Sequence, residues 1–152
     1  MKTIERKRYL DELVSLQNNG MIKVISGIRR CGKSYLLFDI FASYLEQSGI
    51  APDHIIKVDL EDYKNREMRN PDYLYSYVES RLKDRDMYYL LIDEVQMLGS
   101  FEDVLNGFLK RGNIDIYVTG SNAKFLSKDI ITEFRGRGFE VKMYPLCFSE
   151  FM

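Results

Sequence analysis

Residues 27–34 read GIRRCGKS, which is a Gly-x-x-x-x-Gly-Lys-Ser stretch. It follows the apolar run MIKVI at residues 21–25 and precedes a helical pattern over residues 35–45. A glycine-rich loop between a strand and a helix is typical of a phosphate-binding loop, because its backbone N–H groups can surround phosphate oxygens. The sequence therefore predicts a binding site for a nucleoside triphosphate.

Each position of this loop has an expected task. Gly27 permits the tight turn after the strand, and Gly32 lets the backbone come close to the phosphates. We expect Lys33 to place its charge at the β- and γ-phosphates and the Ser34 hydroxyl to ligate Mg²⁺. The helix that follows directs its positive end at the same anion. The candidate nucleotide-binding residues are therefore Gly27, Ile28, Arg29, Arg30, Cys31, Gly32, Lys33, Ser34 and Tyr35.

A second motif, YYLLIDEVQ at residues 88–96, supplies what hydrolysis needs in addition to phosphate binding. Its apolar residues predict a buried strand. Asp93 comes at the carboxyl end of that strand, where it can take Mg²⁺ through Ser34 or through water. Glu94 is the next residue outward and can orient the attacking water or accept its proton. Acidic residues often follow strands without such a role, but the phosphate loop favours the functional interpretation.

Short apolar runs alternate with helical patterns along the whole chain, which indicates parallel β-α-β units and an α/β fold. Helices are expected on both faces of the sheet. Leu74, Tyr77 and Val78 fall at helical spacing, which places them in or beside the core. Residues 61–71 are the most polar stretch and predict a surface loop. The strands are expected at residues 23–25, 55–59, 88–92, 114–119 and 139–144, and the helices at residues 4–17, 33–47, 71–83, 101–112 and 127–134.

The strand at residues 114–119 ends in Gly120, Ser121 and Asn122. If it lies between the strand of the phosphate loop and the strand of Asp93, its end lies beside the phosphates. Ser121 or Asn122 would then contact the γ-phosphate or the water, and Asn122 is the better candidate because its amide both donates and accepts. The alternative is an ordinary turn or helix cap.

Two arginine pairs are further candidates. Arg135 and Arg137, in FRGRG before the last strand, can place a guanidinium on the charge that develops during phosphoryl transfer, in trans from a second copy. The alternative is that they are solvated surface residues. Arg29 and Arg30 contact the phosphates, contact a partner, or point away from the loop.

Acidic residues also follow the second strand. Asp59, Glu61 and Asp62 lie at the sheet edge where the phosphates are expected, so one of them can help to hold the hydrated metal. A solvated acidic loop is the favoured interpretation. His54 precedes the same strand without a Cys or His neighbour, and we interpret it as a loop residue.

Composition limits the remaining possibilities. With 152 residues the chain fits one domain, and its net charge of −1 argues against an overall field for nucleic acid or membrane binding. No apolar run is long enough to span a bilayer, and the first helix is charged rather than a signal peptide, so we expect a cytoplasmic protein. Two cysteines are too few for a disulfide framework or a zinc cluster. The apolar end PLCFSEFM leads us to expect further sequence after Met152.

The segments GIRRCGKS, LLIDEVQ, YVTGSNAKFL and FRGRG followed by PLCFSEF together resemble the AAA-type ATPase domain of a widespread prokaryotic family. That family joins this domain to a C-terminal region of uncharacterised function. The resemblance covers essentially all of residues 1–152. It implies a P-loop NTPase three-layer sandwich with a parallel five-stranded sheet in the order 5-1-4-3-2, Mg-ATP as the ligand and Glu94 as the catalytic glutamate. It also implies that Arg8, Tyr9 and Leu10 lie near the adenine.

The leading hypothesis is an ATPase core that acts as a conformational switch or motor for a partner, and whose lid and C-terminal region are not part of these residues. The catalytic candidates are Lys33, Glu94, Asn122 and Arg137, and the candidate metal-binding residues are Ser34 and Asp93. An arginine finger would make the active form a homo-oligomer. The alternative is an ATP-dependent protein- or nucleic-acid-binding module with little turnover. A small-molecule kinase is disfavoured by Glu94, and the absence of an Asn-Lys-x-Asp segment favours ATP over GTP.

Overall fold

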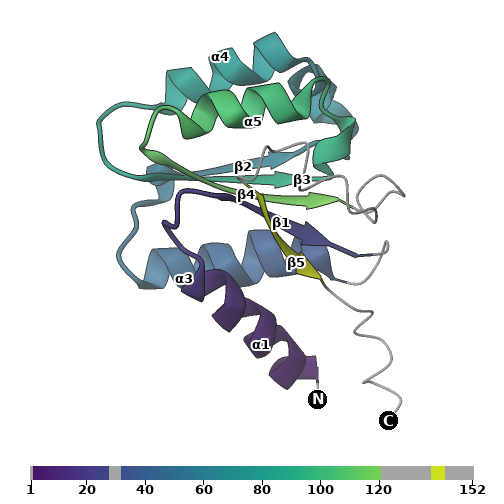
Figure 1. Ribbon diagram of the computed structural model, residues 1–152, viewed down its shortest axis with the longest axis vertical. Helices are drawn as coiled ribbons and strands as arrows, with labels where there is room; N and C mark the ends of the chain where they lie inside the picture. Colours follow the sequence, from purple (N-terminus) through teal and green to yellow (C-terminus); the bar gives the residue numbers. More distant parts are fainter. Residues whose placement is uncertain (1, 28–31, 121–137, 143–152) are drawn as a thin grey trace.

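A five-stranded parallel sheet forms the centre of the molecule (Figure 1). The computed structural model describes residues 2–27, 32–120 and 138–142. The strand order is β2-β3-β4-β1-β5, which confirms the order implied by the family resemblance. The strands are β1 (Ile22–Ser26), β2 (Ile55–Asp59), β3 (Tyr88–Asp93), β4 (Ile114–Gly120) and β5 (Gly138–Lys142).

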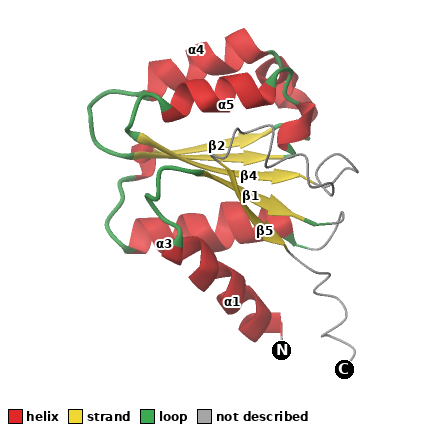
Figure 2. Cartoon of the chain, in the orientation of Figure 1, coloured by secondary structure: helices red, strands yellow, loops and turns green. Residues whose placement is uncertain are grey.

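Helices cover both faces of the sheet, as Figure 2 shows, so the predicted three-layer sandwich is confirmed. Helices α4 (Pro71–Arg81) and α5 (Phe101–Leu109) lie on one face, and α1 (Lys2–Ser15) and α3 (Ala42–Gln47) lie on the other. Helix α4 begins at its predicted residue for a local reason. Pro71 is compatible with a first helical turn, and the Asn70 side chain accepts hydrogen bonds from the N–H groups of Asp72 and Tyr73 at 2.9 and 3.1 Å.

Two hydrophobic cores follow from the alternation of side chains along the strands. Residues such as Val24, Leu90 and Val118 face α4 and α5, where they join Leu74, Val78 and Phe108. Their neighbours Ile25, Leu91 and Tyr117 face the other way and pack with Leu13, Leu37 and Phe41. Strands buried on both faces explain why the sequence shows apolar runs instead of an apolar–polar alternation.

Several elements differ from the sequence-based expectation. The helix expected at residues 33–47 is present as α2 (Lys33–Tyr35), a wider π-helical segment η1 (Leu36–Phe41) and α3. The expected surface loop at residues 61–71 contains the 3₁₀ segment η3 (Tyr63–Arg69), broken by a non-helical residue at Asn65. The helix expected at residues 127–134 lies outside the described residues.

The shorter elements were not predicted, because a single 3₁₀ turn leaves almost no periodic signal. They are η2 (Pro52–His54) and η4 (Val95–Met97), which directly follows Glu94. His54, expected in a loop, is the last residue of η2. Within the described part of the chain, no helix combines the length and the apolar character needed to cross a membrane.

A buried charge pair joins β1 to β4 at the end of the sheet opposite the phosphate loop. Lys23 and Asp115 are fully or almost fully buried, and the Lys23 ammonium donates to the Asp115 carboxylate. Asp115 also accepts hydrogen bonds from the backbone N–H of Asn18 at 2.8 Å and from the Tyr117 hydroxyl at 2.6 Å. Burial lowers the pKa of Lys23 and Asp115 opposes this effect, while burial raises the pKa of Tyr117. The polar groups therefore satisfy one another inside the core.

Candidate functional site

The phosphate loop leaves the carboxyl end of β1 and leads into α2. Gly32 has φ 95° and ψ 14°, a left-handed conformation that glycine adopts without a Cβ clash. Lys33 is 5% exposed, and its ammonium donates a hydrogen bond to the carbonyl oxygen of Gly27 at 3.0 Å. The lysine charge is thus held inside the loop, at the end of the sheet where nucleotides bind in open α/β folds.

Ser34 and Asp93 meet as the sequence predicted. The Ser34 hydroxyl donates to Oδ2 of Asp93 at 2.7 Å, although the two residues are 59 positions apart. Asp93 is 4% exposed at the end of β3, and Ser34 belongs to α2. A hydroxyl and a carboxylate are hard oxygen donors of the kind that bind Mg²⁺, so the donor set at this position fits that ion.

Thr119 is a residue of the candidate site that sequence reasoning missed. Its hydroxyl donates to Oδ1 of Asp93 and accepts the backbone N–H of Glu94 at 2.9 Å. The register pairs Ile92 with Val118, so the last residues of β3 and β4 lie side by side. The sequence analysis instead predicted a role for Ser121 or Asn122, which follow Gly120 at the end of the strand. Comparison of the two strand ends in register would have identified Thr119.

Glu94 is buried, with 6% exposure, and its backbone is left-handed at φ 55° and ψ 55°. Such a conformation costs a non-glycine residue on the order of 1 kcal/mol or more and is concentrated at functional sites. The bond to Thr119 fixes the backbone of Glu94, and Gln96 contacts its side chain. The two carboxylates expected to serve metal and water are therefore adjacent and anchored to the same strand end.

Acidic side chains line the open side of this site. A cavity of about 380 Å³ is lined by Ser34, Asp59, Glu61, Asp62 and Asp93. Asp59 pairs in register with Asp93 on the neighbouring strand. Asp59 and Asp62 each accept a backbone N–H at 3.1 Å from the residue two positions further on, Glu61 and Lys64 respectively, and these bonds shape the turns of the loop locally. These carboxylates line the cavity, while Glu61 is exposed and the Asp62 side chain is 41% exposed, which agrees with the favoured interpretation of a solvated acidic loop.

Comparison with known protein families agrees with this fold and site. The model of a family described as AAA domain matches residues 19–152. The chain belongs to this family. The family match and the strand order of a P-loop NTPase sheet together identify the chain as an AAA-type P-loop ATPase domain.

Curated relatives of this AAA domain are longer proteins. It is 36% identical over 150 residues to an uncharacterized protein of Haemophilus influenzae, a match that covers 98% of the chain and 37% of the relative. An uncharacterized protein of Methanocaldococcus jannaschii is 33% identical over 131 residues, which cover 86% of the chain and 28% of the relative. The chain thus spans about a third of the length of the curated relatives it matches.

Solved structures share the fold of this AAA domain at low sequence identity. AMPPCP-bound DnaA from Aquifex aeolicus aligns with a TM-score of 0.57 and 19% identity, over 88% of this chain and 43% of that one. Drosophila ORC bound to GC-rich DNA and Cdc6 aligns with a TM-score of 0.61 and 13% identity, over 95% of this chain and 57% of that one. At these identities the likeness shows a common fold.

Two aromatic candidates of the AAA domain have defined positions. Tyr35 is 47% exposed, directly after Ser34. Tyr9 is buried in the core cluster that contains Leu36 and Phe41, and Arg8 donates to its hydroxyl at 3.2 Å. Contact of Tyr9 with an adenine remains a prediction. The other candidates lie outside the described residues: Ile28, Arg29, Arg30, Cys31, Ser121, Asn122, Arg135 and Arg137.

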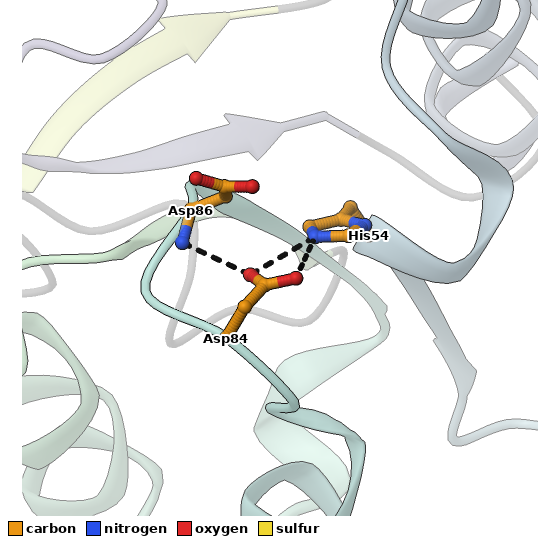
Figure 3. Close-up of side chains that lie close together, drawn as sticks. All are labelled: His54, Asp84 and Asp86. Atoms are coloured by element: carbon orange, nitrogen blue, oxygen red, sulfur yellow. Dashed lines mark hydrogen bonds and ion pairs between the residues drawn. The ribbon is translucent and has the colours of Figure 1, made fainter.

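Away from this site, His54 forms a cluster that the spacing of the sequence did not reveal (Figure 3). His54, Asp84 and Asp86 each offer one ligand atom within 4.8 Å of the others. However, Nδ1 of His54 lies 2.8 Å from an Asp53 carboxylate oxygen, and Nε2 lies 3.0 and 3.1 Å from the two Asp84 oxygens. The imidazole also stacks on Tyr88, with ring centroids 4.3 Å apart. Both ring nitrogens therefore have carboxylate partners, and we interpret the cluster as an ion-pair network.

This network predicts a pH-dependent contribution to stability. The hydrogen bond to Asp53, opposed by burial and aided by Asp84, raises the pKa of His54 above its ordinary value of 6.5. A raised folded-state pKa stabilises the fold below pH 6.5, and this stabilisation is lost as the pH rises through the raised pKa. His54→Gln should therefore lower the thermal unfolding midpoint more at pH 5.5 than at pH 8.5. Asp53→Asn should weaken the same pH dependence, and equal losses at both pH values would contradict the interpretation.

Proposed function

We propose that this AAA domain binds Mg-ATP and hydrolyses it, and that the hydrolysis drives or resets a conformational switch for a partner. The observation that carries the proposal is the contact between two separate sequence motifs: Ser34 donates to Asp93, and the Thr119 hydroxyl joins Asp93 to the backbone N–H of Glu94. A domain that only held a nucleotide would not need a buried glutamate in a strained conformation beside the metal-binding pair.

In the proposed mechanism, Lys33 exchanges the Gly27 carbonyl for the β- and γ-phosphate oxygens, while the first turn of α2 presents its N–H groups to the same anion. Ser34 and Asp93 would hold Mg²⁺. When bound, the ion supplies neutralisation of the charge on the phosphate oxygens. Glu94 orients the attacking water and accepts its proton. Ser121 or Asn122 would contact the γ-phosphate or the water.

The remaining parts of the proposal concern assembly. Arg135 or Arg137 from a second copy would stabilise the charge that develops on the γ-phosphate, so the active form would be a homo-oligomer. The partner acted on by the switch is a protein or a nucleic acid. The chain covers 37% of the Haemophilus influenzae relative, so we extend the proposed ATPase activity to the whole of that longer protein only as part of this proposal.

One alternative has support of its own. In the alternative, ATP organises a surface for a protein or nucleic acid and turnover is incidental. The solved structures that share the fold include Drosophila ORC bound to DNA and Cdc6. DNA binding that requires ATP and weakens steeply with salt would favour a nucleic-acid partner.

The nucleotide site is tested first by equilibrium binding. Lys33→Ala should weaken Mg-ATP binding by about 10- to 100-fold, because it removes a hydrogen bond from a charged donor to the phosphates. Ser34→Ala should weaken binding in Mg²⁺ but leave the weaker binding in EDTA unchanged. The measurement is isothermal titration calorimetry with and without Mg²⁺.

Matched controls are available on the surface of the same domain. Lys110 and Ser48 are exposed and remote from the loop in sequence, so Lys110→Ala and Ser48→Ala should bind Mg-ATP like the wild type. If Lys33→Ala binds Mg-ATP as tightly as Lys110→Ala, the assignment of the phosphate loop is wrong.

A further inference from the structure

Gln96 lies two residues after Glu94, inside the 3₁₀ turn Val95–Met97. Its amide nitrogen Nε2 donates a hydrogen bond to Oε2 of Glu94 at 3.2 Å. The turn itself is closed by the N–H of Met97, which bonds to the Glu94 carbonyl oxygen at 3.0 Å. Gln96 is therefore brought back over the residue proposed to act on the water.

The bond to Glu94 determines the orientation of the Gln96 amide. A carboxylate only accepts hydrogen bonds, so the NH₂ group must face Glu94 and the amide oxygen must point elsewhere. That oxygen, Oε1, is buried and has no hydrogen-bond partner in the structure described. The amide therefore gives one hydrogen bond to Glu94 and leaves its own acceptor unsatisfied.

An unsatisfied buried acceptor is unfavourable for stability, whereas an apolar side chain of similar length would carry no such penalty. The stability of the fold thus offers no reason for an amide here. The local contact that distinguishes glutamine from an apolar residue is the bond to the Glu94 carboxylate. The amide is explained if the orientation of that carboxylate matters.

The backbone of Glu94 is held separately. Its left-handed conformation is fixed by the bond from its N–H to Thr119 at 2.9 Å, on the other strand. Thr119 thus sets where the residue lies, and Gln96 restricts where its carboxylate points. These two contacts come from different elements, β4 and the 3₁₀ turn.

We propose that Gln96 is a positioning residue that orients the Glu94 carboxylate toward the attacking water. This inference rests on the proposed ATP hydrolysis. It assigns no contact between Gln96 and the nucleotide, so nucleotide affinity does not depend on it.

The test replaces Gln96 by a side chain of similar length without a donor. Gln96→Met should lower kcat by about 10-fold, since a misdirected base loses part of its contribution to the rate. The KM for Mg-ATP and the Kd for Mg-ADP should stay within about 2-fold of the wild type. The thermal midpoint should be unchanged or higher, because the unsatisfied oxygen is gone. Gln47→Met, at an exposed position, is the matched control and should leave all four quantities unchanged.

A second variant gives a signature that a structural role would not produce. Gln96→Glu keeps the shape but places a carboxylate beside Glu94, so kcat should fall at pH 8. Its turnover relative to the wild type should recover as the pH is lowered, because a protonated carboxyl group can again donate to Glu94.

The outcomes separate the inference from the function on which it rests. If the wild type releases phosphate and Gln96→Met has the same kcat, the inference is wrong and the ATPase stands. A loss of kcat together with an equal loss of Mg-ADP affinity and of thermal stability would make Gln96 a structural residue and would also overturn the inference. If the wild type neither releases phosphate nor forms a complex with Mg-ADP and fluoroaluminate, both proposals fall.

Discussion

Glu94→Gln is expected to lower ATP turnover by about 100- to 10,000-fold, the usual contribution of a general base, with little change in Mg-ATP affinity. Glutamine keeps the shape of the side chain and its backbone bond to Thr119, so the left-handed turn should survive. It loses the charge that orients the water and accepts its proton. The effect should therefore appear in kcat and not in Kd.

The measurement is steady-state phosphate release, paired with calorimetric titration of Mg-ATP. Glu46→Gln is the matched control, because Glu46 is exposed on α3 and the substitution is identical. Equal turnover in the wild type and in Glu94→Gln would show that Glu94 is not the catalytic glutamate. A parallel loss of binding would show that the substitution damages the nucleotide site itself.

Asp115→Ala is expected to destabilise the domain by about 3–5 kcal/mol, because it leaves the Lys23 ammonium buried without its charge partner. Tyr117 and the backbone N–H of Asn18 lose their acceptor at the same time. Lys23 keeps a hydrogen bond to Asn19 at 3.0 Å, which does not compensate a full charge. The measurement is urea unfolding at pH 7.

A double variant separates the charge from the hydrogen bonds. Lys23→Met combined with Asp115→Ala should recover part of the loss, because no buried charge remains. The part not recovered belongs to the Tyr117 hydroxyl and the Asn18 N–H. A loss below about 1 kcal/mol in the single variant would contradict the account of this pair as a buried, mutually dependent network.

The parts of the molecule that the sequence predicted well are those with a local signal. Within the motif at residues 27–34, the structure describes Gly27 and Gly32 to Ser34, which lie at the predicted junction of strand and helix. The apolar strands at Ile55–Asp59 and Tyr88–Asp93 are long enough to distinguish from turns. The meeting of Ser34 with Asp93 followed from these motifs, because carboxyl ends of parallel strands lie at one edge of the sheet.

The parts that the sequence did not predict depend on contacts between distant residues. Thr119 resembles any strand threonine until the register places it beside Asp93 and Glu94. Lys23 and Asp115 look like ordinary charged residues, yet they are 92 positions apart and bury each other. His54 meets Asp84 only after β2 and β3 pair. In each case the chemical role comes from the tertiary partner and leaves no pattern along the chain.

The most direct test of the central claim is phosphate release from Mg-ATP by the wild-type chain across a range of protein concentrations, beside Glu94→Gln and with EDTA as a control. The account predicts release that requires Mg²⁺ and is lost in the variant. Release that rises faster than linearly with protein concentration would indicate a site completed between copies. Bound ATP with no phosphate release at any concentration would contradict the claim that this domain hydrolyses its nucleotide.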